Sequence, residues 1–123
     1  MRVKDAVGRY GEQLAAAHLE AAGLVVLARN WRRREGELDI VAQDGDEVVF
    51  VEVKTRSSLA FGTPGEAVDR LKAARLRQLA LRWLAAAREL DPERSWASIR
   101  FDVVSVLRRR SGPPEITVVR GAF

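Results

Sequence analysis

Residues 36–54 read GELDIVAQDGDEVVFVEVK, and this stretch has the pattern of a β-hairpin. Residues 36–42 and 48–54 are rich in Val, Ile and Phe, which favour strands, and both alternate charged with apolar side chains. Between them, Asp44 and Gly45 are a strong signal for a two-residue turn. We therefore predict two antiparallel strands that mix charged and apolar side chains on one face.

The register that this turn sets gathers the acidic side chains together. Glu37 lies opposite Glu52, and Asp39 lies opposite Phe50 and diagonal to Glu52. Like charges that face each other on a sheet are destabilising unless a cation compensates them, and Mg²⁺ or Mn²⁺ readily binds carboxylate oxygens. Lys54 follows on the same face, where an amine can orient water or neutralise charge on a phosphate. The hairpin carries the parts of a phosphodiester-hydrolysing centre.

Two interpretations of these charges stay open. Glu52 and Lys54 can form an exposed ion pair worth at most ~1 kcal/mol, and Glu-x-Lys is a common tripeptide. Glu37 and Asp39 favour the metal centre, because acids have low propensity for such strand positions. Glu12 protrudes from a mostly apolar patch of small residues on a predicted helix, so its carboxylate requires either a metal ion or an internal pair with an arginine.

The remaining elements complete an α/β fold. A helix is expected at residues 6–22, capped by Asp5 and stopped by Gly23. A second helix follows the capping box Thr63-Pro64-Gly65-Glu66 and ends near Leu90. Strands are expected at residues 24–28, 99–107 and 115–120, a polar segment at 30–35, a loop at 57–62 and a basic turn at 108–114. The order α-β-β-β-α-β-β predicts a central mixed five-stranded sheet flanked by helices, in a single domain over residues 1–123.

Composition bounds the function. The chain has 123 residues, of which 47% are hydrophobic, enough for one core. The absence of cysteine excludes disulfides, thiol nucleophiles and thiolate zinc sites, and fits a cytoplasmic location. No apolar stretch is long enough to cross a bilayer, so no membrane partner is expected. The net charge of +4 and pI near 10.3 favour a phosphate-bearing polymer as partner.

The motif residues together resemble the signature of the YraN-like bacterial family, known as a family of uncharacterised function. The hairpin and its flanks carry the resemblance through Asn30-Trp31-Arg32, Arg34, residues 36–42 and residues 49–56. Further matches extend it over nearly the whole chain: Gly11, Glu12, Ala15, Gly62, Pro64, Val68, Lys72, Arg75 and residues 100–104. The family is similar to archaeal Holliday-junction resolvases, which implies a restriction-endonuclease-like fold of the PD-(D/E)xK superfamily.

Carried over residue by residue, the resemblance implies a set of roles. Asp39 and Glu52 become metal ligands, Lys54 the catalytic lysine and Glu12 the helix carboxylate, with Glu37 as an additional candidate ligand. Leu38 stands where the superfamily often has proline before the first acid, so that mark of the pattern is missing. Resolvase-like relatives commonly pair, because cutting two strands symmetrically requires two sites, so a homodimer is also expected.

Basic residues supply the expected nucleic-acid contacts. Phosphates next to the cleaved bond are expected on Arg32, Arg34, Arg56, Lys72 and Arg75, with Arg82 on the same side of the long helix and residues 108–110 as a further basic group. The alternative is a set of solvated charges. Trp31 can stack on an unpaired base, although anchoring in the core is the commoner use of such a tryptophan. His18 is expected on a helix surface without a catalytic role.

Three functions fit these observations. The leading hypothesis is an Mg²⁺-dependent endonuclease acting on structured or branched DNA. The alternative is a non-catalytic nucleic-acid-binding module that keeps the nuclease fold, in which case binding persists with a chelator and no product forms. A protein-interaction domain with a structural acidic site is the third, and it requires no affinity for DNA or RNA at low salt.

Overall fold

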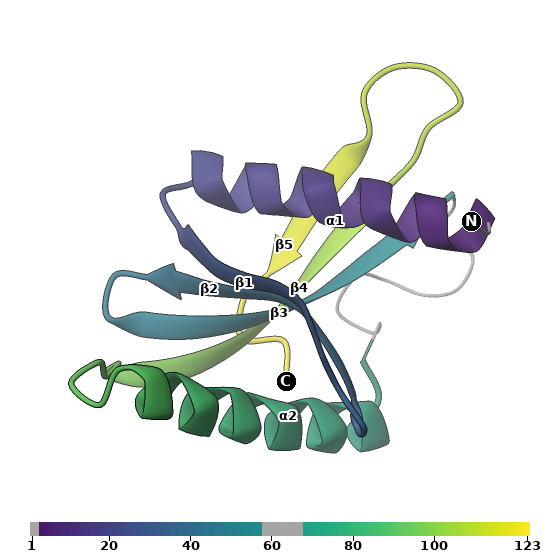
Figure 1. Cartoon of the computed structure of the whole chain (residues 1–123). Coiled ribbons are helices and arrows are strands. Elements are labelled where there is room, and N and C mark those ends of the chain that lie inside the picture. The colour runs from purple at the N-terminus through teal and green to yellow at the C-terminus, as the bar shows by residue number, and fades with distance from the viewer. Residues whose placement is uncertain (1–2, 58–67) are drawn as a thin grey trace.

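A computed structural model describes residues 3–57 and 68–123, with side chains from residue 6 onward (Figure 1). Its elements are α1 (Val3–Ala21), β1 (Val25–Arg33), β2 (Gly36–Asp44), β3 (Glu47–Arg56), α2 (Arg70–Leu90), β4 (Ser98–Leu107) and β5 (Glu115–Val119). The α/β class, the five-stranded sheet and the predicted order of elements are confirmed. No helix in the described ranges is long and apolar enough to span a membrane.

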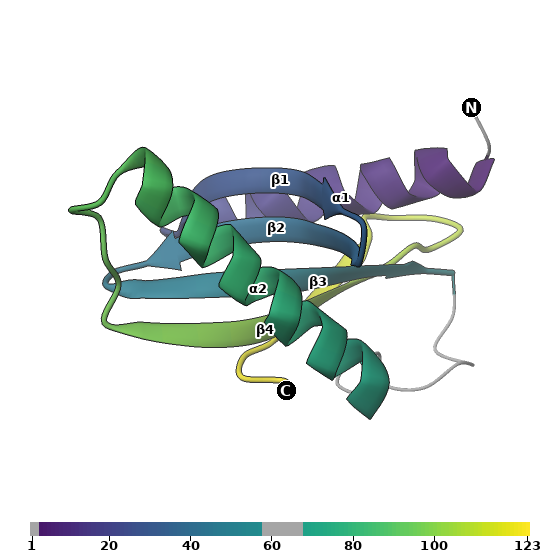
Figure 2. The same cartoon turned by 60° about the horizontal axis from the view of Figure 1, so that its bottom comes forward.

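The sheet is mixed, and its two helices lie on opposite faces. The strand order is β1-β2-β3-β4-β5, with β3 and β4 parallel and every other neighbouring pair antiparallel. Parallel neighbours need a long crossover connection, and α2 lies within that crossover. Figures 1 and 2 show α1 over one face and α2 over the other. The result is a three-layer arrangement in which side chains on both faces of the sheet are buried.

Each helix covers its own hydrophobic core. On the α1 side, Ala15, Ala16 and Leu19 pack against alternate residues of the central strands, such as Ile40 and Val49. On the α2 side, the packing is larger and aromatic, with Leu76, Leu79 and Trp83 covering Val41, Val48 and Phe50. Because both faces of β2 and β3 are buried, any charged residue on these strands requires a specific partner.

Helix α1 approaches the sheet very closely at Gly11. A Cβ atom added at this position would lie 1.7 Å from Thr55 Oγ1 on β3, so only glycine fits. The predicted stop is confirmed: Gly23 has φ +97°, Gly23 N–H bonds to Glu20 O and Leu24 N–H bonds to Leu19 O, which is a Schellman end. The predicted cap is wrong, since the helix begins at Val3 and Asp5 lies in its first turn, which aspartate also favours.

Helix α2 begins at Arg70, where the carboxylate of Asp69 accepts a hydrogen bond of 2.8 Å from Lys72 N–H. The capping box predicted at residues 63–66 and most of the predicted loop at 57–62 lie outside the described residues. The predicted end holds, with Asp91 N–H bonded to Ala87 O.

The two hairpins differ from the prediction in extent and register. Strand β1 continues to Arg33, so residues 31–33 of the predicted polar segment 30–35 are paired with β2. In the second hairpin Asp44 pairs with Glu47, which makes Gly45 and Asp46 the turn. Of the two turn residues Gly45 alone has positive φ, as a type II′ turn requires.

This register shift corrects the predicted partners but keeps their faces. Phe50 pairs with Val41 in the structure, and the prediction that it pairs with Asp39 is wrong. The register differs by two residues, and side chains alternate with a period of two, so the shift by itself moves no side chain to the other face. Asp39 and Glu52 are the next residues beyond the last pair, Ile40 and Val51.

Candidate metal centre

Strands β2 and β3 separate at Asp39. Their backbone pairing runs from Asp44 and Glu47 to Ile40 and Val51 and stops there. Beyond the last pair, Asp39 Oδ2 accepts a hydrogen bond of 2.9 Å from Val53 N–H. A side chain thus takes over where the backbone pairing ends, and it stands between the two strands.

The regular alternation of β2 also breaks at Asp39. Ile40 and Ala42 pack into the α1-side core, whereas Leu38 and Val41 both pack into the α2-side core. On the neighbouring strand, Asn30 has φ +53°, a conformation that asparagine tolerates better than most residues. The first hairpin is therefore irregular in both strands at this point, which frees Asp39 from either core.

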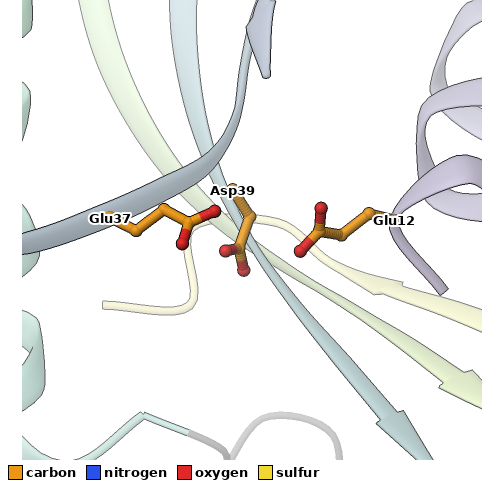
Figure 3. Close-up of side chains that lie close together, drawn as sticks. All are labelled: Glu12, Glu37 and Asp39. Carbon is orange, nitrogen blue, oxygen red and sulfur yellow. The ribbon is translucent and has the colours of Figure 1, made fainter. Parts of the chain in front are cut away.

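Three carboxylates converge at this bend. One oxygen from each of Glu12, Glu37 and Asp39 lies within 4.8 Å of the others. Figure 3 shows Glu12 reaching Asp39 from α1 on one side and Glu37 reaching it on the other. The close approach of Gly11 to Thr55 holds the helix turn that carries Glu12 against the sheet. We call Glu12, Glu37 and Asp39 the three-carboxylate centre.

Burial and mutual repulsion raise proton affinity in this centre. Burial and the charge of Glu52 raise the pKa of Asp39 to about 7, against the opposing hydrogen bond from Val53. Burial and the charge of Glu37 raise the pKa of Glu12, although a hydrogen bond with Asn30 works against the shift. Carboxylates that are costly to ionise together are relieved by a cation, so the donor set fits a hard divalent ion.

Glu52 lies beside this centre but is engaged by two lysines. Its side chain is only 7% exposed, and Oε1 lies 2.6 Å from Lys72 Nζ and 3.3 Å from Lys54 Nζ. Burial and the neighbouring Lys72 lower the pKa of Lys54, whereas Glu52 opposes that change. Burial also disfavours the charged form of Lys72, but its hydrogen bonds with Glu52 and Lys54 and the charges of Glu52 and Asp39 together outweigh burial and raise its pKa.

Three carboxylates, Glu37, Asp39 and Glu52, border one hollow of about 210 Å³ together with Lys72 of α2. Its lining comprises Gly36, Glu37, Asp39, Glu52, Lys72, Arg75, Leu76 and Leu79. Lys72 and Arg75, which were predicted to contact phosphate, both stand at the hollow. The pairing of Lys72 with Glu52 was not predicted.

The other basic residues are spread around the first hairpin and the end of β3. Arg32 pairs with Glu37 at 2.8 Å, and Arg34 is exposed on the β1–β2 turn. Arg56 is half-buried at the last position of β3, and Arg82 is paired with Glu35. Of these positions, Arg32 contacts the three-carboxylate centre through its pair with Glu37.

Two remaining expectations concern single side chains. Trp31 is partly buried against the α2-side core, with the Arg33 guanidinium 3.9 Å from its ring centroid, which fits the anchoring interpretation. His18 is exposed on α1, as expected. Asn30 was not predicted as a partner of Glu12, although it belongs to the motif Asn30-Trp31-Arg32 that carries the family resemblance.

The fold and this site define an α/β protein with a half-buried carboxylate centre where the pairing of two sheet strands ends. The chain belongs to the uncharacterised protein family UPF0102, whose model matches residues 11–106. This confirms the resemblance to the YraN-like bacterial family. Every member of the three-carboxylate centre, and Glu52 with both its lysines, falls within the matched residues.

The similarity to individual relatives covers nearly the whole chain. A UPF0102 protein of Beutenbergia cavernae is 59% identical over 121 residues, which is 98% of each chain. A UPF0102 protein of Frankia casuarinae is 54% identical over 123 residues, all of both chains. One from Nocardia farcinica is 50% identical over 120 residues, covering 98% of this chain and 91% of its own.

Proposed function

We propose that this protein is an Mg²⁺- or Mn²⁺-dependent endonuclease that acts on structured or branched DNA. The observation that carries the proposal is the convergence of Glu12, Glu37 and Asp39 within 4.8 Å, next to a carboxylate that holds two lysines. Acids alone would only bind a cation. Lys72 and Arg75, which line the hollow beside Asp39 and Glu52, add what phosphodiester chemistry needs, which is a group for the charge on phosphate.

The divalent ion, when bound, would activate a water and stabilise charge on the phosphate. Asp39 and Glu12 would hold it, with Glu37 and Glu52 as further ligands. Lys54 would orient the attacking water or donate to the phosphate, since burial lowers its pKa toward the range of useful acid–base groups. Arg75 at the hollow, and Arg32, Arg34 and Arg56 farther out, would hold phosphates along the substrate.

The basic composition supports DNA as the polymer. The net charge is +4, and arginines outnumber lysines eighteen to three. Arginine binds phosphate through a planar, bidentate fork that suits a backbone of closely spaced phosphates. Two copies of the chain would be required to cut two strands of a branch symmetrically.

Calorimetry with Mn²⁺ tests the centre without a known substrate. The wild-type protein should bind Mn²⁺, and Asp39→Ala should lose this binding. Exposed Asp46→Asn on the β2–β3 turn is the matched control and should keep it. Equal binding by wild type and Asp39→Ala would remove the metal centre from the proposal.

Cleavage assays test the activity itself. Four-way junction and flap DNA should be cut in the presence of Mg²⁺ by wild type and Asp46→Asn, but not by Asp39→Ala or Glu52→Ala. DNA binding that persists with a chelator, with no product from any substrate, would instead identify a non-catalytic binding module. Cleavage by the Asp39→Ala and Glu52→Ala proteins would contradict the endonuclease assignment at these residues.

A further inference from the structure

Glu52, the carboxylate beside the three-carboxylate centre, is already paired with two cationic side chains. Oε1 accepts from both Lys54 and Lys72, and one carboxylate oxygen has two lone pairs, so this atom is fully used. A buried carboxylate without such partners would be strongly destabilising. The protein therefore supplies its own counter-charges to Glu52 when no other cation is present.

The two lysines differ in how firmly they are placed. Lys54 is two residues from Glu52 on β3, so strand geometry fixes it on the same side. Lys72 belongs to the first turn of α2 and reaches Glu52 from another layer of the fold. Its side chain is 35% exposed against 27% for Lys54. A lysine with a long flexible stem and access to solvent can leave the pair without becoming a buried unpaired charge.

The departure of Lys72 would free Glu52 toward the three-carboxylate centre. Asp39 and Glu52 line the same hollow, and Lys72 and Arg75 line it as well. A divalent ion held by Asp39 would meet the ammonium of Lys72 close by, and two cations this near repel each other strongly in a partly buried site. Glu52 carries a single negative charge, so it can neutralise one of these cations fully but not both.

We propose that Lys72 is a built-in counter-ion that a divalent cation displaces from Glu52, which releases its ammonium to bind a DNA phosphate at the hollow. The proposal rests on the proposed function and adds a coupling between metal binding and substrate binding. The protein without metal keeps Glu52 neutralised by Lys72. The protein with metal gains the free ammonium of Lys72 where the phosphate lies. Metal binding therefore raises the affinity of the protein for DNA.

Lysine-selective NMR tests the displacement directly. The chain has only three lysines, Lys4, Lys54 and Lys72, so their side-chain signals can be assigned by single substitutions. Titration with Mg²⁺ should shift the Lys72 signal, and Glu52→Gln should place that signal near its metal-shifted position before any Mg²⁺ is added. A Lys72 signal that stays in place while Mg²⁺ binds would overturn the displacement.

Calorimetry measures the competition. Lys72→Met keeps the aliphatic stem but removes the charge, and it should bind Mn²⁺ about tenfold more tightly than wild type. Arg70→Gln removes a positive charge two residues earlier on α2, on a different side of the helix, and should leave the affinity near wild type. In a Glu52→Gln background, the gain from Lys72→Met should disappear, which separates competition at Glu52 from general repulsion.

DNA binding at varied salt measures the released ammonium. With Ca²⁺ in place of Mg²⁺, Lys72→Met should lower the slope of the log–log salt plot by about one unit relative to wild type. With a chelator, the same substitution should leave the slope unchanged. Equal slopes for Lys72→Met and wild type with Ca²⁺ as well as with the chelator would contradict the coupling.

The two proposals fail in different ways. Wild-type protein that binds no divalent ion would overturn both. Wild-type protein that binds Mn²⁺ through Asp39, with equal affinity in Lys72→Met, would overturn only the displacement and leave the endonuclease proposal intact.

Discussion

At the scale of single residues, Asp39 joins the structure and the chemistry. It receives a hydrogen bond from the backbone of β3, and it also stands between two other carboxylates. Burial and the charges of the neighbouring carboxylates, working against the bond from Val53, make the folded protein hold a proton on Asp39 more tightly than the unfolded chain does. Its pKa is about 7 in the fold against an ordinary value of 3.8.

Substitution Asp39→Asn should change how stability depends on pH. The stabilisation from the Asp39 proton is complete below about pH 4 and is lost as pH rises through about 7, because the folded pKa is the higher one. Asparagine cannot ionise but can still accept from Val53 N–H. The unfolding free energy of the variant relative to wild type should therefore increase between pH 5 and pH 8.

Urea unfolding with a chelator measures this difference. Asp46→Asn on the exposed turn controls for the loss of one carboxylate. A difference between Asp39→Asn and wild type that stays constant with pH would contradict the high proton affinity of Asp39.

Gly11 fixes the distance between α1 and the sheet. Gly11→Ala should destabilise the fold by about 1–3 kcal/mol through overpacking. Rotation of the threonine cannot relieve the contact, because the new methyl group would also lie 2.9 Å from Thr55 Cβ. Mn²⁺ affinity should fall as well, since Glu12 is the next residue.

Gly8→Ala is the matched control on the same helix. No neighbouring atom lies within 4 Å of its added Cβ, so it should be neutral or stabilise by up to ~1 kcal/mol. Thermal unfolding and Mn²⁺ calorimetry check both variants. Equal stability of the two variants would show that α1 is not seated as closely as the structure has it.

At the scale of elements, the sequence predicts those features of the strands and turns that depend on side-chain alternation and on turn residues. Residues 48–54 fall within β3 because apolar side chains recur on both faces of a buried strand. The extension of β1 to Arg33 was not predictable in this way, since its outer part is exposed and polar. The hairpin register was also not predicted correctly. Asp44-Gly45 and Gly45-Asp46 both suit a tight turn, and only the backbone conformation distinguishes them.

The same limit applies to the candidate site. Asp39 and Lys54 were predicted on one face because side chains alternate between the two faces along a strand. The contact of Lys72 with Glu52 depends on where the crossover places α2, which no local pattern encodes. The contact between Lys72 and Glu52 joins two layers of the fold, so only the folded structure shows it.

Strand β4 depends on a buried charge network that also fastens the end of the chain. Asp102 is 1% exposed and accepts from Arg100 and from Gly121 N–H, and Arg100 also reaches Asp44 and Glu47. Asp102→Asn should cost about 2–4 kcal/mol, because it leaves part of the guanidinium uncompensated.

Asp44→Asn removes a more exposed partner of the same arginine and should cost at most ~1 kcal/mol. Chemical denaturation of the two variants gives both values. Similar losses in the two would show that the buried partner has no special weight.

At the scale of the whole molecule, charge is distributed so that acids occupy the inside of the site and arginines the outside. The three-carboxylate centre is half-buried, whereas Arg75 on α2 is exposed at the rim of the hollow. A negatively charged polymer would thus meet cations first and reach the acids only where a metal ion compensates them.

Under the proposed function, Arg75→Gln should weaken binding to DNA of any sequence. The expected change is a salt slope lower by about one unit, because one phosphate contact is lost. Arg88→Gln, near the end of α2 and about 20 Å along the helix, is the matched control and should leave the slope unchanged. Fluorescence anisotropy with labelled junction DNA at several salt concentrations measures both, and equal slopes would exclude the hollow as the phosphate path.

The bond from Val53 to Asp39 gives the molecule an internal reporter. Most amides of a central strand exchange with deuterium only when the sheet opens, but this one is held by a carboxylate at the end of the pairing. Its exchange rate should therefore respond to whatever Asp39 binds. A single peptide amide, followed over hours in heavy water, would register occupancy of the centre in a protein that is otherwise unlabelled and unmodified.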